Sequence, residues 1–386
     1  MSSGEEKPLV VIRSLVYNHE PYLRDCLEGF VMQQTSFPFV AVVHDDCSTD
    51  GSAAIIREYA EKSPHIIKPV YETENQFSKK DGSLRRAISE ACGKYGAKYY
   101  ALCEGDDYWT DPRKLQKQVD FLETHPDYTM VCCNCEIHMP DKKLATHEDF
   151  IEAGWVHSDE DRELTAEETF EQHGRYAHTA GLVYRAQLMA SDCYERLVGL
   201  NGDIRLQFTA VTTGRLYHMK DRMFVYRFMV PGSWSAKEKR DTAYEKCRAY
   251  LTRFIRALNA CDEINARKYH QSVCQSIENA LFWQLRLHPG HRKSIIRDFK
   301  PHFLLKHVSG YRYRGQSYRH PFLVRLCHFP YFPFNLFHDC FVHPLFRGIY
   351  RRTAMKHTWH IGPLNLVSHV EGEPRGHWFV LGCKVK

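Results

Sequence analysis

The chain has 386 residues, of which 43% are hydrophobic and 26% are charged. This composition is globular and excludes a disordered chain, and the length suffices for one large domain or two ordinary ones. The formal net charge of +5 is unevenly spread, because residues 291–356 contain two acids, Asp298 and Asp339, against more than ten lysines and arginines. Such a basic segment indicates an anionic surface as a partner, either a membrane or a nucleic acid.

The first residues, MSSGEEKPLVV, lack the basic start and apolar stretch of a secretory signal. No stretch approaches the roughly 18 uninterrupted apolar residues of a membrane-spanning helix. We therefore expect a cytoplasmic protein whose 14 cysteines are reduced thiols. Cys132, Cys133 and Cys135 match no common zinc spacing and lie in an apolar, strand-like run. We expect buried side chains there rather than a metal site.

The first third of the chain alternates strand and helix patterns. Strands are predicted at 9–15, 39–43, 66–71 and 99–103. A helix is predicted after each of them, and the third helix spans 84–92. The apolar faces of the other three contain Leu23, Cys26, Leu27, Phe30 and Val31 in the first, Ile55, Ile56 and Tyr59 in the second, and Leu115, Val119 and Leu122, behind Pro112, in the last. This alternation predicts an α/β fold with a largely parallel, doubly wound sheet flanked by helices.

The pattern changes in the second half. A polar stretch at 141–168 is expected to hold a loop and a helix, and patterned sequence resumes with YAHTAGLVYR and LNGDIRLQFTAVTTGRLYHM. From about Tyr244 the composition is helical, and beyond His291 it is basic, aromatic and without a clear period. We therefore predict an α/β domain at 1–240 and a helical, basic and aromatic region at 241–386.

Two acidic clusters follow predicted strands, Asp45-Asp46 in HDDCSTDGS and Glu104, Asp106 and Asp107 in CEGDDYW. Doubly wound sheets bind ligands at the carboxyl ends of their strands, so the two clusters should share one crevice. Clustered carboxylates repel one another unless a cation is present, and Mg²⁺ or Mn²⁺ prefers such oxygens. Because the glycine-rich phosphate-binding motifs are absent, the pattern favours a phosphate held through a metal.

Three segments resemble successive blocks of the family-2 glycosyltransferases: VIRSLVYNHEPYLRDCLEGFVMQQ, VVHDDCSTDGSAAIIREYAEK and YYALCEGDDYWTDPRKLQKQVDFLETHPDY. The resemblance covers about residues 8–240 and is strongest to near residue 135. It implies a GT-A fold, a nucleotide-sugar donor and transfer that generally inverts the sugar carbon. The predicted domain at 1–240 would then be the catalytic domain.

The resemblance also implies a donor site. Tyr17 would lie against the nucleobase, unless it is an ordinary core tyrosine, and Asp46 would accept the N3 hydrogen of a uracil-type base. Asp106 would contact the ribose or the metal, and Asp107 would ligate the metal at the diphosphate. Glu104 holds the first place of the acidic triplet, where aspartate is commoner, and is counted with the metal ligands.

Further roles follow from the same resemblance. Asp203 in LNGDIRLQF would deprotonate the acceptor hydroxyl, with a helix cap as the alternative. Arg85 or Arg86 would meet a donor phosphate, unless both are solvated surface. A closing loop near the diphosphate and an acceptor-facing strand add weaker candidates, namely Trp234, Ser235, His178 and Thr179.

The sequence thus predicts a metal-dependent inverting glycosyltransferase that uses Mn²⁺ or Mg²⁺. It would move a sugar from a nucleotide diphosphate, first of all a UDP-sugar, to a glycan or lipid-linked saccharide in surface polysaccharide synthesis. Residues 291–356 would dock on the inner face of the plasma membrane, or alternatively pack on the core or form a dimer surface. A nucleotidyltransferase and a nucleic-acid-binding protein are the alternatives. A nucleic-acid-binding role leaves both acidic clusters unexplained, so we expect no nucleic-acid partner.

Overall fold

The computed structural model describes residues 6–139, 158–231, 233 and 244–299, together with short strands between 311 and 385 whose side chains are not described. The chain forms two compact units, the first comprising residues 1–277 and 312–316 and the second residues 278–311 and 317–386. Each unit is described by itself. The functional division at residue 240 stays a prediction.

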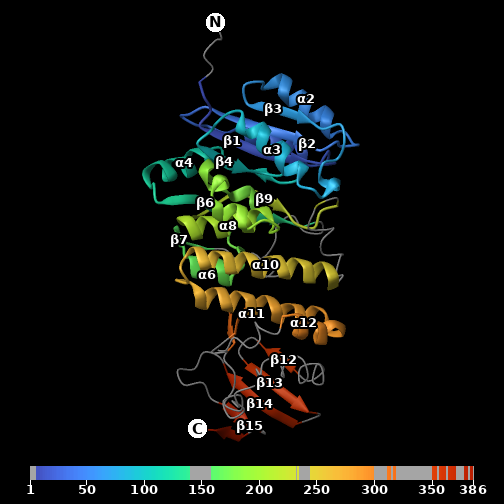
Figure 1. Ribbon diagram of the computed structural model, residues 1–386, viewed down its shortest axis with the longest axis vertical. Helices are drawn as coiled ribbons and strands as arrows, with labels where there is room; N and C mark the ends of the chain where they lie inside the picture. The colour runs from blue at the N-terminus through green and yellow to red at the C-terminus, as the bar shows by residue number, and fades with distance from the viewer. Residues whose placement is uncertain are drawn as a thin grey trace. The chain divides into compact units, whose positions relative to one another are not determined.

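The first unit is built on a nine-stranded sheet in the order β3-β2-β1-β4-β8-β6-β9-β5, with β7 paired to β9 (Figure 1). Four neighbouring strands are parallel, namely β1 (Val10–Val16), β2 (Phe39–Asp45), β3 (Ile67–Tyr71) and β4 (Tyr99–Leu102). All four coincide with predicted strands. They confirm the predicted α/β class for this half of the sheet.

The other half of the sheet is mixed. Strand β8 (Val183–Arg185) runs antiparallel to both β4 and β6 (Tyr128–His138), whereas β6 and β9 (Arg215–Arg227) are parallel. Two short strands, β5 (Tyr108–Trp109) and β7 (Arg162–Leu164), pair antiparallel with β9. The sheet is therefore less parallel than the sequence predicts. Strand β8 comes later in the chain but lies between β4 and β6, and it runs antiparallel to both.

Helices flank the sheet. The helices of the first half are α1 (Leu23–Val31), α2 (Ser52–Lys62), α3 (Ser83–Gly93) and α4 (Lys114–Thr124). Further along the first unit are α6 (Ala166–Glu171), α7 (Asp192–Arg196), α8 (Gly202–Thr213), α10 (Tyr244–Ile264) and the part of α11 (His270–Leu287) up to residue 277, whereas α12 (Arg292–Asp298) belongs to the second unit. Because side chains alternate along a strand, β1 sends Val10 and Ile12 into one hydrophobic cluster and Val11 into another beneath α3.

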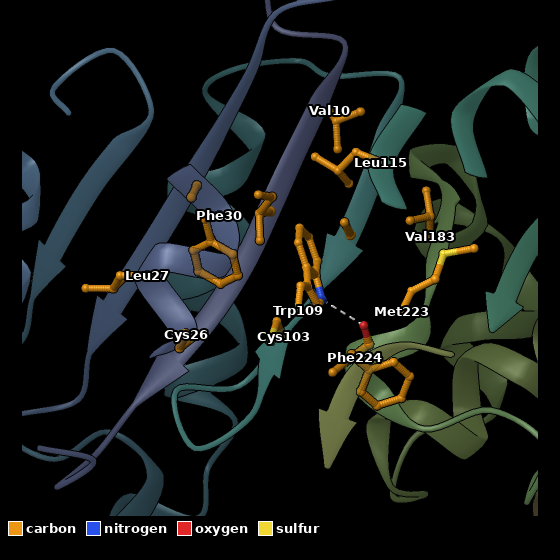
Figure 2. Close-up of a cluster of buried hydrophobic side chains, with 14 of the residues drawn as sticks. Val10, Cys26, Leu27, Phe30, Cys103, Trp109, Leu115, Val183, Met223 and Phe224 are labelled. Carbon is orange, nitrogen blue, oxygen red and sulfur yellow. Dashed lines mark hydrogen bonds between the residues drawn. The ribbon is translucent and has the colours of Figure 1, made fainter. Parts of the chain in front are cut away.

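Trp109 anchors the segment that joins β4 to β5. Its side chain is 1% exposed, and its ring meets Phe30 edge-on with centroids 5.2 Å apart (Figure 2). The indole N–H donates to the carbonyl oxygen of Ala180 at 2.9 Å. Gly29 of α1 permits this packing, because a Cβ there would lie 2.9 Å from the backbone nitrogen of Trp109. The chain directly after the acidic turn is thereby fixed in place.

The remaining expectations have mixed outcomes. Cys132, Cys133 and Cys135 are buried free thiols in β6, as predicted. None of the described helices is long and apolar enough to cross a membrane. Within 241–386 the predicted helices are present, but a five-stranded antiparallel sheet that was not predicted follows them, formed by β12 (Tyr350–Thr353), β13 (Lys356–Ile361), β14 (Leu364–Val370), β15 (Trp378–Val380) and β16 (Cys383–Val385). Most of the proposed membrane segment 291–356 lies outside the described residues.

Candidate active site

Both acidic clusters lie at the carboxyl end of β1. The backbone N–H of Asp46 donates to the carbonyl of Val16 at 2.9 Å, and the N–H of Gly105 donates to the carbonyl of Leu15 at 3.0 Å. A Cβ at residue 105 would lie 2.7 Å from Nδ1 of His19, so a glycine allows this close approach. The structure therefore brings the two clusters to one edge, as the sequence predicts.

Asp107 is the most enclosed acid of the turn that contains Glu104, Asp106 and Asp107, with 2% of its surface exposed. Its Oδ1 accepts the backbone N–H of Arg227 at 2.8 Å. Burial, followed by repulsion from Asp106, raises the pKa of Asp107 well above its ordinary value. A buried acid in this state would be stabilised by a cation.

His178 does not supply that positive charge. Its Nδ1 lies 3.7 Å from Oδ2 of Asp107, but the same nitrogen accepts the backbone N–H of Ala180 at 3.3 Å. Burial lowers the pKa of His178 to about 3, so the ring is neutral at physiological pH. His178 begins the turn η2 (Thr179–Gly181), which also contains Thr179, and its ring packs on Tyr226 with centroids 3.8 Å apart.

Arg227, at the end of β9, holds the acidic turn in place. Its Nη1 donates to the carbonyl oxygen of Asp106 at 2.9 Å, and its Nη2 pairs with Asp25 of α1. The guanidinium also lies over the rings of Tyr108 and Tyr22, at 4.4 and 5.2 Å from their centroids. Sequence reasoning missed Arg227, because an arginine at a strand end has no local pattern that marks it.

Glu104 points back toward β1, where its Oε2 accepts the backbone N–H of Leu15 at 3.3 Å. Although part of the residue is exposed, burial of the carboxyl and repulsion from Asp106 raise its pKa to about 8. The charge of Asp203 contributes to the same rise, so Asp203 lies within electrostatic range of Glu104.

Asp203 is in the first turn of α8, after the N-cap residue Asn201. It is therefore not itself the helix cap that the alternative interpretation expected. Burial raises its pKa above the ordinary value, which brings the carboxyl closer to the range of a general base. Its assignment as the base remains a prediction.

Asp46 and Tyr17 have different surroundings. The carboxylate of Asp46 is 3% exposed and accepts the backbone N–H groups of Gln76 and Phe77 at 2.7 and 3.0 Å. Tyr17, just beyond β1, is 38% exposed, so it is not a core residue. The two loops that carry them are joined, because Asn18 Oδ1 accepts the backbone N–H of Thr49 at 2.7 Å. Their contacts with a nucleobase remain predictions.

The remaining candidates are the two arginines proposed for a donor phosphate and the two residues of the predicted closing loop. Arg85 is on α3, where its Nη1 lies 3.7 Å from Glu195 of α7, and Arg86 beside it lies 3.7 Å from Asp81. Trp234 and Ser235 lie outside the described residues. Their predicted place in a closing loop therefore stays a prediction.

The acids are hard oxygen donors, which suits Mg²⁺ or Mn²⁺. Among the residues described, no three His, Cys, Asp or Glu side chains converge as a metal cage. Mg²⁺ commonly takes only one or two carboxylates and completes its shell with phosphate oxygens and water. Asp106 and Asp107 fit that requirement, since they repel one another and have no cation beside their carboxylates in the described region.

Comparison with known proteins finds a family match over part of the chain. Residues 14–186 match the family described as "Glycosyl transferase family 2". "Uncharacterized protein Rv1520" of Mycobacterium tuberculosis is 33% identical over 223 residues, which are 58% of this chain and 60% of that protein. "Putative teichuronic acid biosynthesis glycosyltransferase TuaG" of Bacillus subtilis is 34% identical over 116 residues, or 30% of this chain and 42% of that protein.

The chain thus spans less than two thirds of the length of the curated relatives it matches. Among solved structures, TarS of S. aureus (residues 1–349), in complex with UDP-GlcNAc, aligns with a TM-score of 0.47 and 15% identity over 96% of this chain and 98% of that one. At that level no residue role is transferred from it. The matched segment 14–186 contains both acidic clusters and the strands that carry them. Residues 14–186 are thus a segment that matches the family-2 glycosyltransferases.

Proposed function

We propose that this protein transfers a sugar from a nucleotide diphosphate donor to a hydroxyl of a glycan or lipid-linked saccharide. UDP-sugars are the donors that we favour. Inversion at the sugar carbon and a role in surface polysaccharide synthesis belong to the same proposal. The family match over 14–186 carries it, because that segment includes both acidic clusters at the end of β1. The relative named for teichuronic acid biosynthesis supports the polysaccharide setting.

In this proposal the chain's residues divide the work. Tyr17 and Asp46 hold the nucleobase. Each carboxylate oxygen of Asp46 already accepts one backbone N–H and has a second lone pair that can accept a hydrogen bond from the base. Asp106 and Asp107 hold a divalent cation, which when bound neutralises the diphosphate as it leaves. Glu104 is counted with these ligands from the resemblance alone. Its bond to Leu15 and its raised pKa favour a supporting role.

Asp203 would remove the proton of the acceptor hydroxyl as its oxygen attacks the sugar carbon. Its position in the first turn of α8 and its raised pKa support this role. Arg85 as a donor-phosphate ligand, and Trp234 in a closing loop, are further predictions from the resemblance.

Calorimetric titration of UDP tests the donor site, with and without Mn²⁺, on wild type and Asp107→Asn. Asparagine keeps an oxygen for the N–H of Arg227 but removes the charge, so the metal-dependent gain in UDP affinity should disappear. Asp120→Asn, at an exposed site of α4, is the matched control and should bind as wild type does. Failure of wild type to bind UDP, GDP or dTDP with either metal would contradict the proposal.

We also propose that the basic segment 291–356 contacts an anionic membrane, as its composition suggests. Flotation of the full chain with vesicles of phosphatidylglycerol, compared with vesicles of phosphatidylcholine, tests this. Equal recovery of the protein with both kinds of vesicle, or no recovery with either, would contradict docking through charge.

A further inference from the structure

A cavity of about 360 Å³ opens on the face of the sheet that α3 covers, between α3 and the segment formed by η3 (Ala186–Ala190) and α7. Three arginines line it, Arg13 from β1 and Arg85 and Arg86 from α3. Its lining contains a single acid, Glu195. The cavity therefore has a net positive lining, in contrast to the acidic turn at the end of the same sheet.

Arg13 is unusual for its position, because its strand neighbour on this face, Val11, packs into a hydrophobic cluster. Its Nη1 donates to the hydroxyl of Tyr184 at 3.1 Å and to the sulfur of Met189 at 3.2 Å. Its Nε is buried and has no hydrogen-bond partner among the described residues. No carboxylate of the described region pairs with Arg13, and an anion would stabilise this partly buried guanidinium.

The two arginines of α3 differ in their partners. Arg85 lies 3.7 Å from Glu195, whereas Arg86 lies 3.7 Å from the Asp81 carboxylate and donates Nη1–H to the Asp81 backbone carbonyl at 2.9 Å. Ser89, one turn further along α3, adds a hydroxyl to the same wall. Guanidinium groups match the oxygens of phosphates and carboxylates, so this lining suits an oxyanion.

The opposite wall connects the cavity to the predicted base. Tyr194 of α7 lines the cavity, and its carbonyl accepts Nε–H of Arg205 at 2.7 Å. Arg205 also lies over the Tyr194 ring, 3.5 Å from its centroid, and belongs to α8 two residues after Asp203. The backbone N–H of Cys103 donates to the carbonyl oxygen of Arg13 at 3.2 Å, so Arg13 lies beside the strand end that leads into the acidic turn. An anion bound here would thus be next to the side of the site where Asp203 is expected to act.

We propose that this cavity binds an anionic group, a phosphate or a carboxylate, that the acceptor carries. The inference rests on the proposed function, because it needs an acceptor. It assigns Arg85 to the acceptor rather than to the donor diphosphate. Arg13, Arg85 and Arg86 are the residues that would select an acidic saccharide or a sugar phosphate over a neutral sugar.

The first test is a titration of the full chain in metal-free buffer with inorganic phosphate, with glucuronate, and with glucose as the neutral control. We expect at least one anion to bind, and its affinity to fall about tenfold or more in both Arg13→Gln and Arg85→Gln. Arg57→Gln, at an exposed position of α2, should leave the affinity unchanged. Arg85 is on the surface, so that variant is expected to fold even if Arg13→Gln does not.

The second test repeats the titration with UDP and Mn²⁺ at saturation. Continued binding of the anion supports a site separate from the donor's. Competition between UDP and the anion would assign the cavity to the donor diphosphate and overturn the proposal. Binding of neither anion, or equal binding to all variants, would overturn it as well. If UDP itself does not bind, the proposed function fails, while the metal-free titration still decides whether the cavity is an anion site.

Discussion

The acids at the end of β2 and the acids that follow β4 form similar clusters in the sequence but have different surroundings in the structure. Asp46 is buried with two backbone N–H groups on its carboxylate, at 2.7 and 3.0 Å. Asp107 is equally buried, but its one backbone donor is offset by repulsion from Asp106. A buried carboxylate with local donors is stable by itself, whereas clustered ones need a cation. Asp46 therefore already has a structural role, whereas the acids of the turn after β4 are the ones proposed above to hold a metal.

The largest expected effect comes from removing the acid that is satisfied. Asp46→Ala leaves the N–H groups of Gln76 and Phe77 without their partner, so the free energy of unfolding should fall by about 2–4 kcal/mol. Asp106→Ala should change it by less than about 0.5 kcal/mol, because removing one of two repelling charges offsets the lost contacts. Urea unfolding of both variants without metal measures the difference. Equal losses would contradict the distinction between the two clusters.

What the sequence could predict follows from local pattern. The four parallel strands and the helices between them have clear apolar periods. Because the carboxyl ends of parallel strands meet at one edge of a sheet, both acidic clusters could be predicted to lie at that edge. The partners of those acids could not be predicted, because they come from distant segments. Arg227 is 120 residues from Asp107, whose carboxylate accepts its backbone N–H, and β8 enters the sheet between strands that precede it in the chain.

Other features escaped prediction for different physical reasons. Arg13 occupies a strand position where burial alone would favour an apolar residue, and a cavity lining has no sequence period. The five-stranded sheet of residues 350–385 comes from a segment where aromatic and basic residues hide any alternation. Asp203 was correctly predicted at a helix start, but its proximity to Glu104 depends on how α8 packs on the rest of the unit.

The second expected effect concerns the support of the acidic turn. Arg227→Met removes the side-chain bond to the Asp106 carbonyl and the pairing with Asp25, while the backbone N–H that binds Asp107 remains. We expect the Mn²⁺-dependent affinity for UDP to fall about tenfold and the free energy of unfolding by about 1 kcal/mol. Calorimetry and urea unfolding measure the two quantities.

Two further variants make this test specific. Arg227→Lys should recover part of the affinity, because an ammonium can still reach either the carbonyl oxygen of Asp106 or the carboxylate of Asp25. Arg222→Met, at an exposed position of the same strand, removes a similar side chain and should leave both quantities unchanged. A loss of stability without a loss of affinity in Arg227→Met would mean that the arginine stabilises the fold but does not position the turn.

The smallest effect is a pH dependence of stability without metal. The pKa of Glu104, about 8 in the folded protein, lies above its ordinary value of 4.5, so the folded state binds this proton more tightly. The stabilisation is therefore complete below pH 4.5 and is lost as the pH rises toward 8. Because part of the side chain is exposed, we expect a loss of about 1 kcal/mol rather than the full value of the shift.

Glu104→Gln isolates this contribution, because glutamine stays neutral and can still accept the N–H of Leu15. Between pH 5 and pH 8 the variant should lose less stability than wild type, by about 1 kcal/mol, in urea unfolding at each pH. Glu90→Gln on the exposed side of α3 removes the same charge away from the turn and should follow wild type. Identical slopes for Glu104→Gln and wild type would mean that the repulsion within the turn does not act through Glu104. The contrast with Asp46 would then rest on Asp106 and Asp107 alone.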